Sequence, residues 1–392
     1  MRYQSHFNTA VSLIRVYDGS VPLVHFLKKY FAEHKKHGSR DRKLISHLCY
    51  GYYRLGHALK ELETAERLKI AIFLCNETAG DWAFLFEEDW LAAWAVPIPE
   101  KIHWLQQKYP LFSAAAMFPW TAALSEEIDQ EAFILSHFIQ PDLFLRIRPG
   151  KEKQVLAKLR EQQIVFSQLT DTCLALANTT KIDSVLDIDK EVVIQDYSSQ
   201  QVARFLSLTT QHSPLTKTTV WDCCAASGGK SLLACDVLTG IELTVSDIRP
   251  SILRNLKERF DRAGIKQYRS FTADLAHSSI TTHHAPYHIV LCDAPCSGSG
   301  TWGRTPEQLF FFTREKITAY ADLQQKIIAN VLPQVAKGGY LLYITCSVFR
   351  QENEEQVQFI LQQGGFELVK MELLKGYDLK ADSMFAALLR RR

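Results

Sequence analysis

The stretch Lys337–Ser347, KGGYLLYITCS, carries the clearest structural pattern in this chain. It reads as a Gly-Gly turn followed by a short apolar strand, and Cys346 stands where the strand ends. A second cysteine, Cys296, has a matching context, because the apolar run Tyr287–Cys292 is followed by the sequence DAPC. In open α/β sheets, ligands bind at the carboxyl ends of the strands. We therefore expect two thiols and the carboxyl group of Asp293 to meet at one edge of a sheet.

Residues 201–392 show the rhythm of a doubly wound domain, in which short apolar strands alternate with helices. The expected strands are Thr219–Cys223, Glu242–Ser246, Arg269–Thr272, His288–Cys292 and Tyr340–Thr345. The helices expected between them are Lys230–Leu238, Arg249–Ala263, Lys316–Val335 and Glu352–Gln362. Strands that are joined through helices form a parallel sheet with right-handed crossovers. The fold class predicted for this domain is therefore α/β and Rossmann-like.

The first half of the chain divides into two further predicted regions. Residues 1–128 carry apolar residues at helical spacing, as in Lys43–Leu59, and they predict an all-helical domain. Residues 129–200 predict a small α/β module that leads into the third domain. In this module Leu143–Arg148 alternates as a strand, and Lys151–Gln163 reads as an amphipathic helix.

The composition is that of an ordinary globular protein of 392 residues, with 47% hydrophobic and 22% charged residues. No apolar run reaches the ~20 residues of a membrane span, and the N-terminus lacks the apolar block of a signal peptide. We therefore expect a cytoplasmic protein without membrane contact, and we favour a monomer. The nine cysteines have no paired spacing, and no histidine is spaced as a zinc partner. This pattern predicts free thiols and no metal site.

The charge of the chain leaves the question of a nucleic-acid partner open. A net charge of +2 permits nucleic-acid binding but does not by itself indicate it. A basic cluster lies at His34–Lys43. It is either a solvated loop before a helix that Ser39 caps or a patch that contacts phosphates, and the sequence allows both interpretations.

The segment Cys224–Lys230, CAASGGK, follows the first expected strand of the third domain and opens its first helix. Small residues there let the backbone approach a ligand, and the helix N-terminus offers unpaired N–H groups. A P-loop needs a glycine five positions before Gly229, where this chain has Cys224, and a dinucleotide fingerprint is also absent. Two interpretations are left, a loop around the amino-acid end of S-adenosylmethionine, which we favour, and a plain strand–helix turn. The candidate cofactor-binding residues are Cys224, Ala225, Ala226, Ser227, Gly228, Gly229 and Lys230.

Carboxylates stand at the ends of three successive expected strands. Asp247 ends the second strand, where an acid accepts hydrogen bonds from a ribose diol. Asp274 follows the third strand and is placed to face an adenine amino group, and Asp293 follows the fourth. A single aspartate at a strand end is more often a helix cap or a turn former. Three on one edge favour a ligand site.

Thiols beside a methyl donor suit the methylation of cytosine. Carbon 5 of cytosine is a poor nucleophile, and it becomes reactive when a thiolate adds to carbon 6. The resulting enamine attacks the methyl group of a sulfonium, and loss of the carbon 5 proton then expels the thiolate. Asp293 is placed to pair with the exocyclic amine of the base, and Lys230 is one source of the positive field that stabilises a thiolate. The candidate thiols are Cys346 and Cys296.

These motifs resemble those of the Sun/Fmu family of RNA 5-methylcytosine methyltransferases. The resemblance covers about residues 190–360, in the order of the family. The matching segments are CAASGGK (Cys224–Lys230), DIR (Asp247–Arg249), DAPCSGSGTWGRTPE (Asp293–Glu307), YITCS (Tyr343–Ser347) and ENEEQV (Glu352–Val357). The chain departs from the family at Ser227, where proline is usual, and at Ile344, where serine is usual.

The resemblance implies a class I methyltransferase domain that uses S-adenosylmethionine. It implies that Cys346 is the nucleophile and that Cys296 assists release of the methylated product. RNA is the implied partner, with ribosomal RNA favoured over transfer RNA. Cys296 is the alternative nucleophile, because the corresponding DNA enzymes use the Pro-Cys motif. A ribosome-assembly factor without catalysis and a nucleoside-triphosphate enzyme are the other functions that we consider.

The segment Gly298–Arg314 is rich in glycine and then in aromatic residues. We expect it to line the pocket for the base, with Trp302 or Arg304 in contact with the flanking nucleotides. The alternative is a loop followed by a core aromatic patch at Phe310–Phe312. The target base must leave its stack to reach a thiol in a cleft, which costs least in single-stranded or loop RNA.

Overall fold

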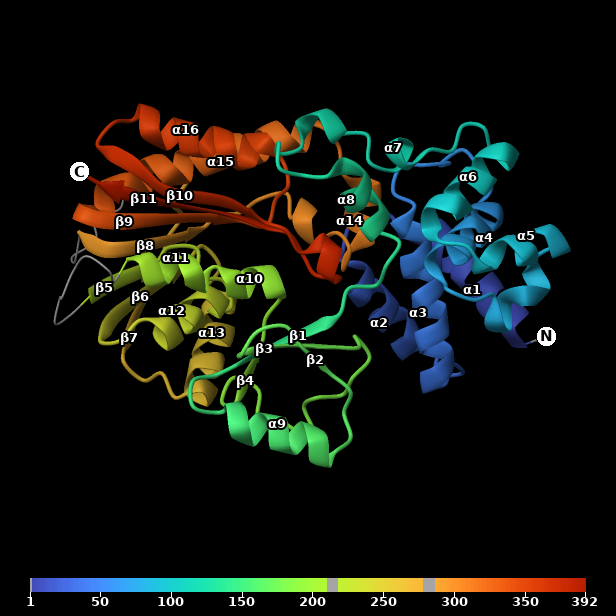
Figure 1. The fold of residues 1–392 in the computed structure, drawn as a ribbon, viewed down its shortest axis with the longest axis horizontal. Helices are drawn as coiled ribbons and strands as arrows, with labels where there is room; N and C mark the ends of the chain where they lie inside the picture. Colours follow the sequence, from blue (N-terminus) through green and yellow to red (C-terminus); the bar gives the residue numbers. More distant parts are fainter. Residues whose placement is uncertain (1, 210–217, 278–285) are drawn as a thin grey trace. The chain divides into compact units, whose positions relative to one another are not determined.

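The computed structural model describes residues 2–209, 218–277 and 286–392 (Figure 1). The chain forms two compact units, which we call the helical unit and the sheet unit. The helical unit comprises Met1–Leu124, Asp129–Gln140 and Thr301–Arg314. The sheet unit comprises Ser125–Ile128, Pro141–Gly300 and Glu315–Arg392. None of the helices in the described residues is long and apolar enough to cross a membrane.

The helical unit consists of helices that pack around aromatic side chains. Its α-helices are α1 (Arg2–Val16), α2 (Leu23–Glu33), α3 (Ser39–Arg54), α4 (Thr64–Cys75), α5 (Glu88–Ala92), α6 (Ile98–Lys108), α7 (Ala114–Met117), α8 (Gln130–Ser136) and α14 (Pro306–Phe311). Arg67 is fully buried in this unit and donates hydrogen bonds to the carbonyl oxygens of Tyr52, Gly56 and Ala58. The predicted helical N-terminal region is confirmed.

The larger sheet of the sheet unit has the strand order β10-β11-β9-β8-β5-β6-β7 within the described residues. Its strands are β5 (Thr218–Asp222), β6 (Ile241–Asp247), β7 (Tyr268–Thr272), β8 (Tyr287–Asp293), β9 (Val335–Thr345), β10 (Phe366–Leu374) and β11 (Met384–Arg391). The strands from β9 to β7 in this order are parallel, as the sequence predicts. β10 and β11 are antiparallel additions that the sequence analysis missed.

Helices cover both faces of this sheet. Figure 1 shows α15 and α16 over one face and α11, α12 and α13 over the other. Their bounds are α10 (Tyr197–Gln201), α11 (Ala203–Leu208), α12 (Gly229–Val237), α13 (Pro250–Ala263), α15 (Glu315–Val331) and α16 (Glu354–Gln362). The core of the sheet is aliphatic and includes Val220, Leu291 and Leu342. This arrangement is the doubly wound, Rossmann-like fold that the strand rhythm predicts.

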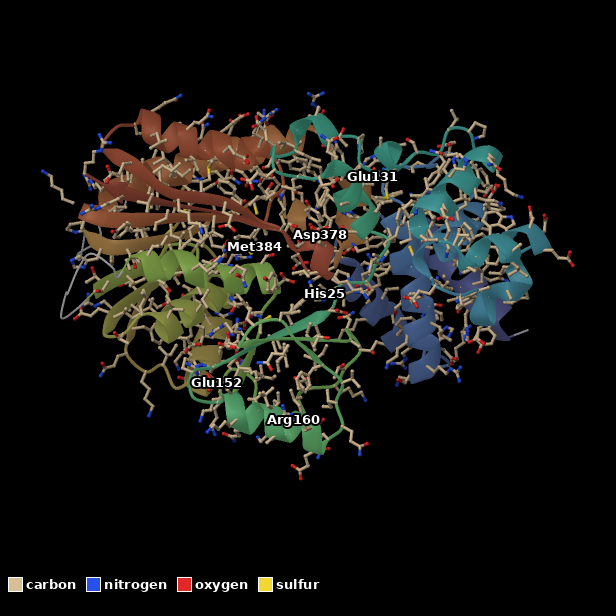
Figure 2. All side chains as sticks on the ribbon, in the orientation of Figure 1. His25, Glu131, Glu152, Arg160, Asp378 and Met384 are labelled. Carbon is tan, nitrogen blue, oxygen red and sulfur yellow. The ribbon has the colours of Figure 1, made fainter. Side chains whose placement is uncertain are left out.

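A smaller antiparallel sheet has the order β2-β3-β1-β4 and its own apolar core. Its elements are β1 (Leu143–Ile147), α9 (Glu152–Glu161), β2 (Ser167–Gln168), β3 (Cys173–Leu176) and β4 (Val192–Ile194). In Figure 2, Glu152 and Arg160 mark α9, and Met384 marks the start of β11. The division of the chain into domains at 1–128, 129–200 and 201–392 stays a prediction.

Buried ion pairs join the smaller sheet to the helices of the larger one. Asp236 on α12 accepts hydrogen bonds from Arg146 at 2.5 Å and from Arg148 at 2.8 Å. Asp189 accepts hydrogen bonds from Arg259 at 2.7 Å and from Arg262 at 2.9 Å. Both aspartate side chains are at most 6% exposed, so that each depends on its arginine partners to offset the cost of burial.

Gly228 and Gly264 provide a matched test of how the glycine loop packs. Both have a positive φ, +83° and +78°, where an added side chain costs about 1–2 kcal/mol. A Cβ at Gly228 would lie 2.7 Å from the Phe260 ring, whereas a Cβ at Gly264 would meet nothing within 4 Å among the described residues. Gly228→Ala should therefore lower the melting temperature more than Gly264→Ala in thermal unfolding. Equal losses would show that the loop does not pack tightly on α13.

Candidate active site

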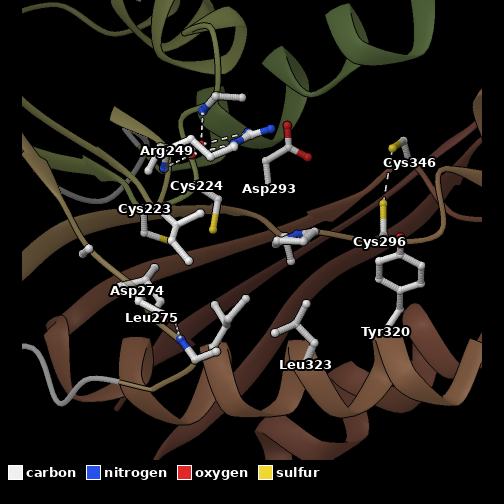
Figure 3. A pocket seen from close by; sticks show the side chains of 18 residues that line it. Cys223, Cys224, Arg249, Asp274, Leu275, Asp293, Cys296, Tyr320, Leu323 and Cys346 are labelled. Carbon is white, nitrogen blue, oxygen red and sulfur yellow. Dashed lines mark hydrogen bonds and ion pairs between the residues drawn. The ribbon is translucent and has the colours of Figure 1, made fainter. Parts of the chain in front are cut away.

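A cavity of about 560 Å³ lies at the carboxyl ends of the parallel strands (Figure 3). Asp247 and Asp293 are the last residues of β6 and β8, and Cys346 directly follows β9. One wall comes from α15. The lining residues are Cys223, Cys224, Ala226, Asp247, Ile248, Arg249, Ala273, Asp274, Leu275, Ala276, Asp293, Ala294, Pro295, Cys296, Tyr320, Leu323, Ile327 and Cys346.

The cavity brings together most of the predicted site residues. The predicted residues that line it are Cys224, Ala226, Asp247, Asp274, Asp293, Cys296 and Cys346. Within the part of the chain that the structure describes, the others flank the cavity rather than line it. These flanking residues are Ala225, Ser227, Gly228, Gly229 and Lys230. The sequence did not single out the wall formed by Tyr320, Leu323 and Ile327, because α15 carries no motif to mark it.

The sulfur atoms of Cys296 and Cys346 lie 3.3 Å apart, at hydrogen-bonding distance for two thiols (Figure 3). Both residues are partly exposed, so that a ligand in the cavity can reach them. The pKa of the Cys296 thiol is raised well above its usual value, first by the hydrogen bond with Cys346 and then by burial. Either sulfur can act as the donor in this contact.

Lys230 pairs with Asp293 rather than with a thiol. Its Nζ lies 3.1 Å from Oδ2 of Asp293, and its side chain is only 10% exposed. The Asp293 side chain is 29% exposed and keeps access to the cavity. Both residues were predicted to lie at the site, but their contact was not predicted.

Asp247 is held as an ionised carboxylate at the edge of the cavity. Its Oδ2 accepts a hydrogen bond from the Ala226 N–H at 3.0 Å, and its Oδ1 accepts one from the Arg249 N–H at 2.9 Å. Burial acts to raise the pKa of Asp247, but the hydrogen bonds from Arg249 and Ala226 outweigh it and hold the pKa below the usual value. Asp274 accepts hydrogen bonds from the Ala276 N–H and the His277 ring, both at 3.0 Å.

The two departures from the family pattern are accommodated differently. Ser227 is exposed, and its carbonyl and hydroxyl oxygens both lie 3.4 Å from Nη1 of Arg259. Ile344 is fully buried in β9, where it belongs to the aliphatic core of the sheet.

The prediction that Trp302 touches nucleotides is wrong. Its ring is fully buried in the helical unit and packs against the rings of Phe118, Trp120 and Phe312. A side chain with no exposed surface cannot stack on a base. The role predicted for Arg304 stays a prediction.

Asp222 is a buried acid to which the sequence analysis gave no role. It ends β5, is fully buried, and accepts a hydrogen bond from the Ser231 hydroxyl at 2.5 Å. Its Oδ1 has no hydrogen-bond partner among the described residues. Burial raises its pKa to about 7. One signal in the sequence could have identified Asp222: it stands at the end of a central strand, directly before the glycine loop.

The strand order, the glycine loop after β5 and the carboxylate that ends β6 define a Rossmann-like class I methyltransferase fold, and the predicted fold class is confirmed. Residues 208–388 match the 16S rRNA methyltransferase RsmB/F family. The predicted resemblance to the Sun/Fmu family is therefore confirmed over this part of the chain.

Curated relatives carry the name of the same family. The chain is 30% identical over 234 residues to the probable ribosomal RNA small subunit methyltransferase B of Bacillus subtilis. This alignment covers 58% of this chain and 51% of that protein. It is 30% identical over 268 residues to the ribosomal RNA small subunit methyltransferase B of Xylella fastidiosa. This alignment covers 65% of this chain and 60% of that protein. The chain thus spans about half the length of the curated relatives it matches.

Solved structures share the fold. The crystal structure of PH0851 aligns with a TM-score of 0.72 at 19% identity and covers 98% of each chain. The crystal structure of NSun6 from Pyrococcus horikoshii with SFG aligns with a TM-score of 0.58 at 15% identity, over 70% of this chain and 97% of that one. At these identities the likeness establishes the fold alone.

The raised pKa of Asp222 predicts a pH-dependent stability that Asp222→Asn removes. An unfolded aspartate titrates near pH 3.9, at about its reference value, whereas folded Asp222 keeps its proton up to about pH 7. Between these values the folded protein binds the extra proton, so that this group's contribution to stability falls as the pH rises. Each pH unit is worth about 1.4 kcal/mol.

The measurement is the free energy of unfolding of wild type minus that of Asp222→Asn, between pH 5 and pH 7. The difference should become less favourable to the wild type as the pH rises. A difference that does not change with pH would show that Asp222 is ionised throughout this range.

Proposed function

We propose that this chain transfers a methyl group from S-adenosylmethionine to carbon 5 of a cytosine in RNA, with ribosomal RNA favoured over transfer RNA. The observation that carries the proposal is the pair of partly exposed thiols, 3.3 Å apart, in one cavity with Asp293 and Asp247. The match of residues 208–388 to the 16S rRNA methyltransferase family supports it. The names of the curated relatives favour ribosomal RNA as the substrate.

The residues around the cavity fit S-adenosylmethionine. Asp247 presents an ionised carboxylate for ribose hydroxyl groups, and Asp274 lies at the same edge. Ile248, Leu275 and Leu323 offer apolar surface for an adenine ring. The cavity volume of about 560 Å³ lies within the range of small-molecule sites. When bound, S-adenosylmethionine supplies a methyl group that the positive charge of its sulfonium makes electrophilic.

Cys346 is the proposed nucleophile. Its thiolate forms a bond to carbon 6 of the cytosine, and the displaced electron pair becomes available at carbon 5. Asp293 accepts a hydrogen bond from the exocyclic amine and orients the base. Once carbon 5 carries the methyl group, a solvent water molecule accepts the carbon 5 proton, and the electron pair of that C–H bond restores the double bond between carbons 5 and 6. The bond from carbon 6 to sulfur breaks, and its electron pair returns to Cys346 as the thiolate.

Cys296 is the proposed partner in release. Because its pKa is raised, it remains a neutral thiol beside Cys346. A neutral thiol donates a hydrogen bond to the neighbouring sulfur, which stabilises that sulfur as a thiolate both before addition and on departure. We therefore assign the two cysteines different roles in the proposed reaction.

The helical N-terminal region carries an exposed basic cluster. We propose that the helical N-terminal region, at about residues 1–128, contributes to RNA binding. In that region Lys35, Lys36 and Arg40 are exposed, so that the basic cluster is accessible to phosphates. The cytoplasmic location and the monomeric state stay predictions.

Substitution of each cysteine in turn separates the two roles. Cys346→Ala should abolish transfer of tritiated methyl groups to RNA, because it removes the nucleophile. Cys296→Ala should accumulate a covalent protein–RNA adduct that survives denaturing gel electrophoresis, because release is impaired. Cys235→Ala, a cysteine of α12 outside the cavity lining, is the matched control and should behave as wild type.

The opposite pattern would make Cys296 the nucleophile, as in DNA enzymes. Absence of methyl transfer by the wild type, with RNA from a strain that lacks the gene, would favour a non-catalytic assembly factor. Tight binding of ATP in place of S-adenosylmethionine would favour the nucleoside-triphosphate alternative.

A further inference from the structure

Glu352 is a buried carboxyl group that contacts both of the loops that carry the thiols. It lies in the short turn Arg350–Glu352 after β9 and is fully buried. Its Oε2 accepts hydrogen bonds from the Ser297 N–H at 2.8 Å and from Nε2 of Gln324 at 3.1 Å. Its Oε1 accepts one from the Ser347 hydroxyl at 2.7 Å. Ser297 directly follows one thiol, and Ser347 directly follows the other.

Further hydrogen bonds close the connection between the two loops. Oγ of Ser347 lies 3.2 Å from Oγ of Ser297 and 3.2 Å from Oγ of Ser299. Nε2 of Gln324 also donates to the Pro295 carbonyl at 3.0 Å. The residues on both sides of Cys296 are therefore hydrogen-bonded to Glu352, Ser297 directly and Pro295 through Gln324.

The hydroxyl of Tyr343 fixes the backbone of Glu352 in turn. It donates a hydrogen bond to the Glu352 carbonyl at 2.7 Å, and Tyr343 is itself fully buried in β9. Burial of a carboxyl group costs free energy unless hydrogen bonds replace water. Here three donors from three different segments provide these bonds, and two of the segments carry the thiols.

We propose that Glu352 is a positioning residue that holds the loops of Cys296 and Cys346 so that their sulfur atoms lie 3.3 Å apart. This inference rests on the proposed function and deepens it. Among the described residues, Glu352 does not line the cavity, so that its loss should leave cofactor binding largely intact. The expected defect is in the chemical step, which depends on the distance between the two sulfurs.

The test compares Glu352→Ala with the conservative variant Glu352→Gln. Alanine removes every acceptor, and a displacement of about 1 Å can cost about 100-fold in rate. Glutamine keeps one oxygen for the Ser297 N–H, and the Ser347 hydroxyl can rotate to accept from its amide group. We expect Glu352→Ala to slow single-turnover methyl transfer about 100-fold without a matching loss of S-adenosylmethionine affinity. Glutamine should restore most of the rate.

A second readout does not depend on methyl transfer. The oxidant diamide takes one hydrogen from each of two neighbouring thiols and leaves a disulfide, and the bridge from Cys296 to Cys346 is identified by peptide mapping. The wild type should form this disulfide faster than Glu352→Ala. If the wild type forms it but transfers no methyl group, the proposed function fails, and the oxidation rates still decide the role of Glu352.

Glu354→Ala is the matched control. Glu354 is a neighbouring acid that accepts a hydrogen bond from the Ser125 hydroxyl at 2.9 Å and, among the described residues, has no direct bond to either thiol loop. Glu354→Ala should keep the wild-type rates of methyl transfer and of disulfide formation. If Glu352→Ala does not fold, Ser347→Ala takes its place. It removes the 2.7 Å bond to Glu352 and the 3.2 Å contacts to Ser297 and Ser299, but leaves Glu352 its bonds from the Ser297 N–H and Gln324. Both rates should then fall by less.

Two results would overturn the inference. One is disulfide formation in Glu352→Ala, or in its substitute Ser347→Ala, at the wild-type rate. The other is a glutamine variant as defective as alanine, which would mean that the charge of Glu352 matters rather than its hold on the loops.

Discussion

The parallel pairing of β8 with β9 is the interaction on which the site depends. Asp293 at the end of β8 lies opposite Ile344 near the end of β9, so that the two loops start at the same level. The Gly300 N–H then donates to the Cys346 carbonyl at 2.9 Å, and a Cβ at Gly300 would lie 2.0 Å from the Ser383 carbonyl oxygen. Only glycine allows the first loop to pass this closely to Ser383, which directly precedes β11.

The sequence predicted the parts of the structure that have a local signature. The expected strands His288–Cys292 and Tyr340–Thr345 are apolar runs bounded by a turn or a helix, and such runs are readable one at a time. Arg269–Thr272 has a single apolar residue and was expected from the alternation of strands and helices. Asp247, Asp293 and Cys346 stand at the ends of such runs. Once the sheet is assumed to be parallel, their meeting at one edge follows from topology. The fold class, the three aspartates of the cavity and its two reactive thiols could therefore be stated from the sequence.

What the sequence did not provide depends on contacts between distant residues. β10 and β11 pair antiparallel, and nothing local in Phe366–Leu374 or Met384–Arg391 indicates that pairing. Trp302 looked like a loop residue, but it is buried among rings from elsewhere in the helical unit. Glu352 was noted only as part of the ENEEQV motif. Its role was not predicted, because its hydrogen-bond partners come from three separate segments. Side-chain partners of this kind are set by tertiary packing, which local patterns do not record.

In the proposed reaction, Cys346 forms the bond to the base while Cys296 remains a thiol. RNA that carries 5-fluorocytosine tests it most directly, since fluorine replaces the proton that must leave carbon 5 and the covalent adduct cannot resolve. Mass-spectrometric mapping of the adduct peptide should place the nucleotide on Cys346. An adduct on Cys296, or no adduct from a protein that binds both S-adenosylmethionine and RNA, would contradict the account.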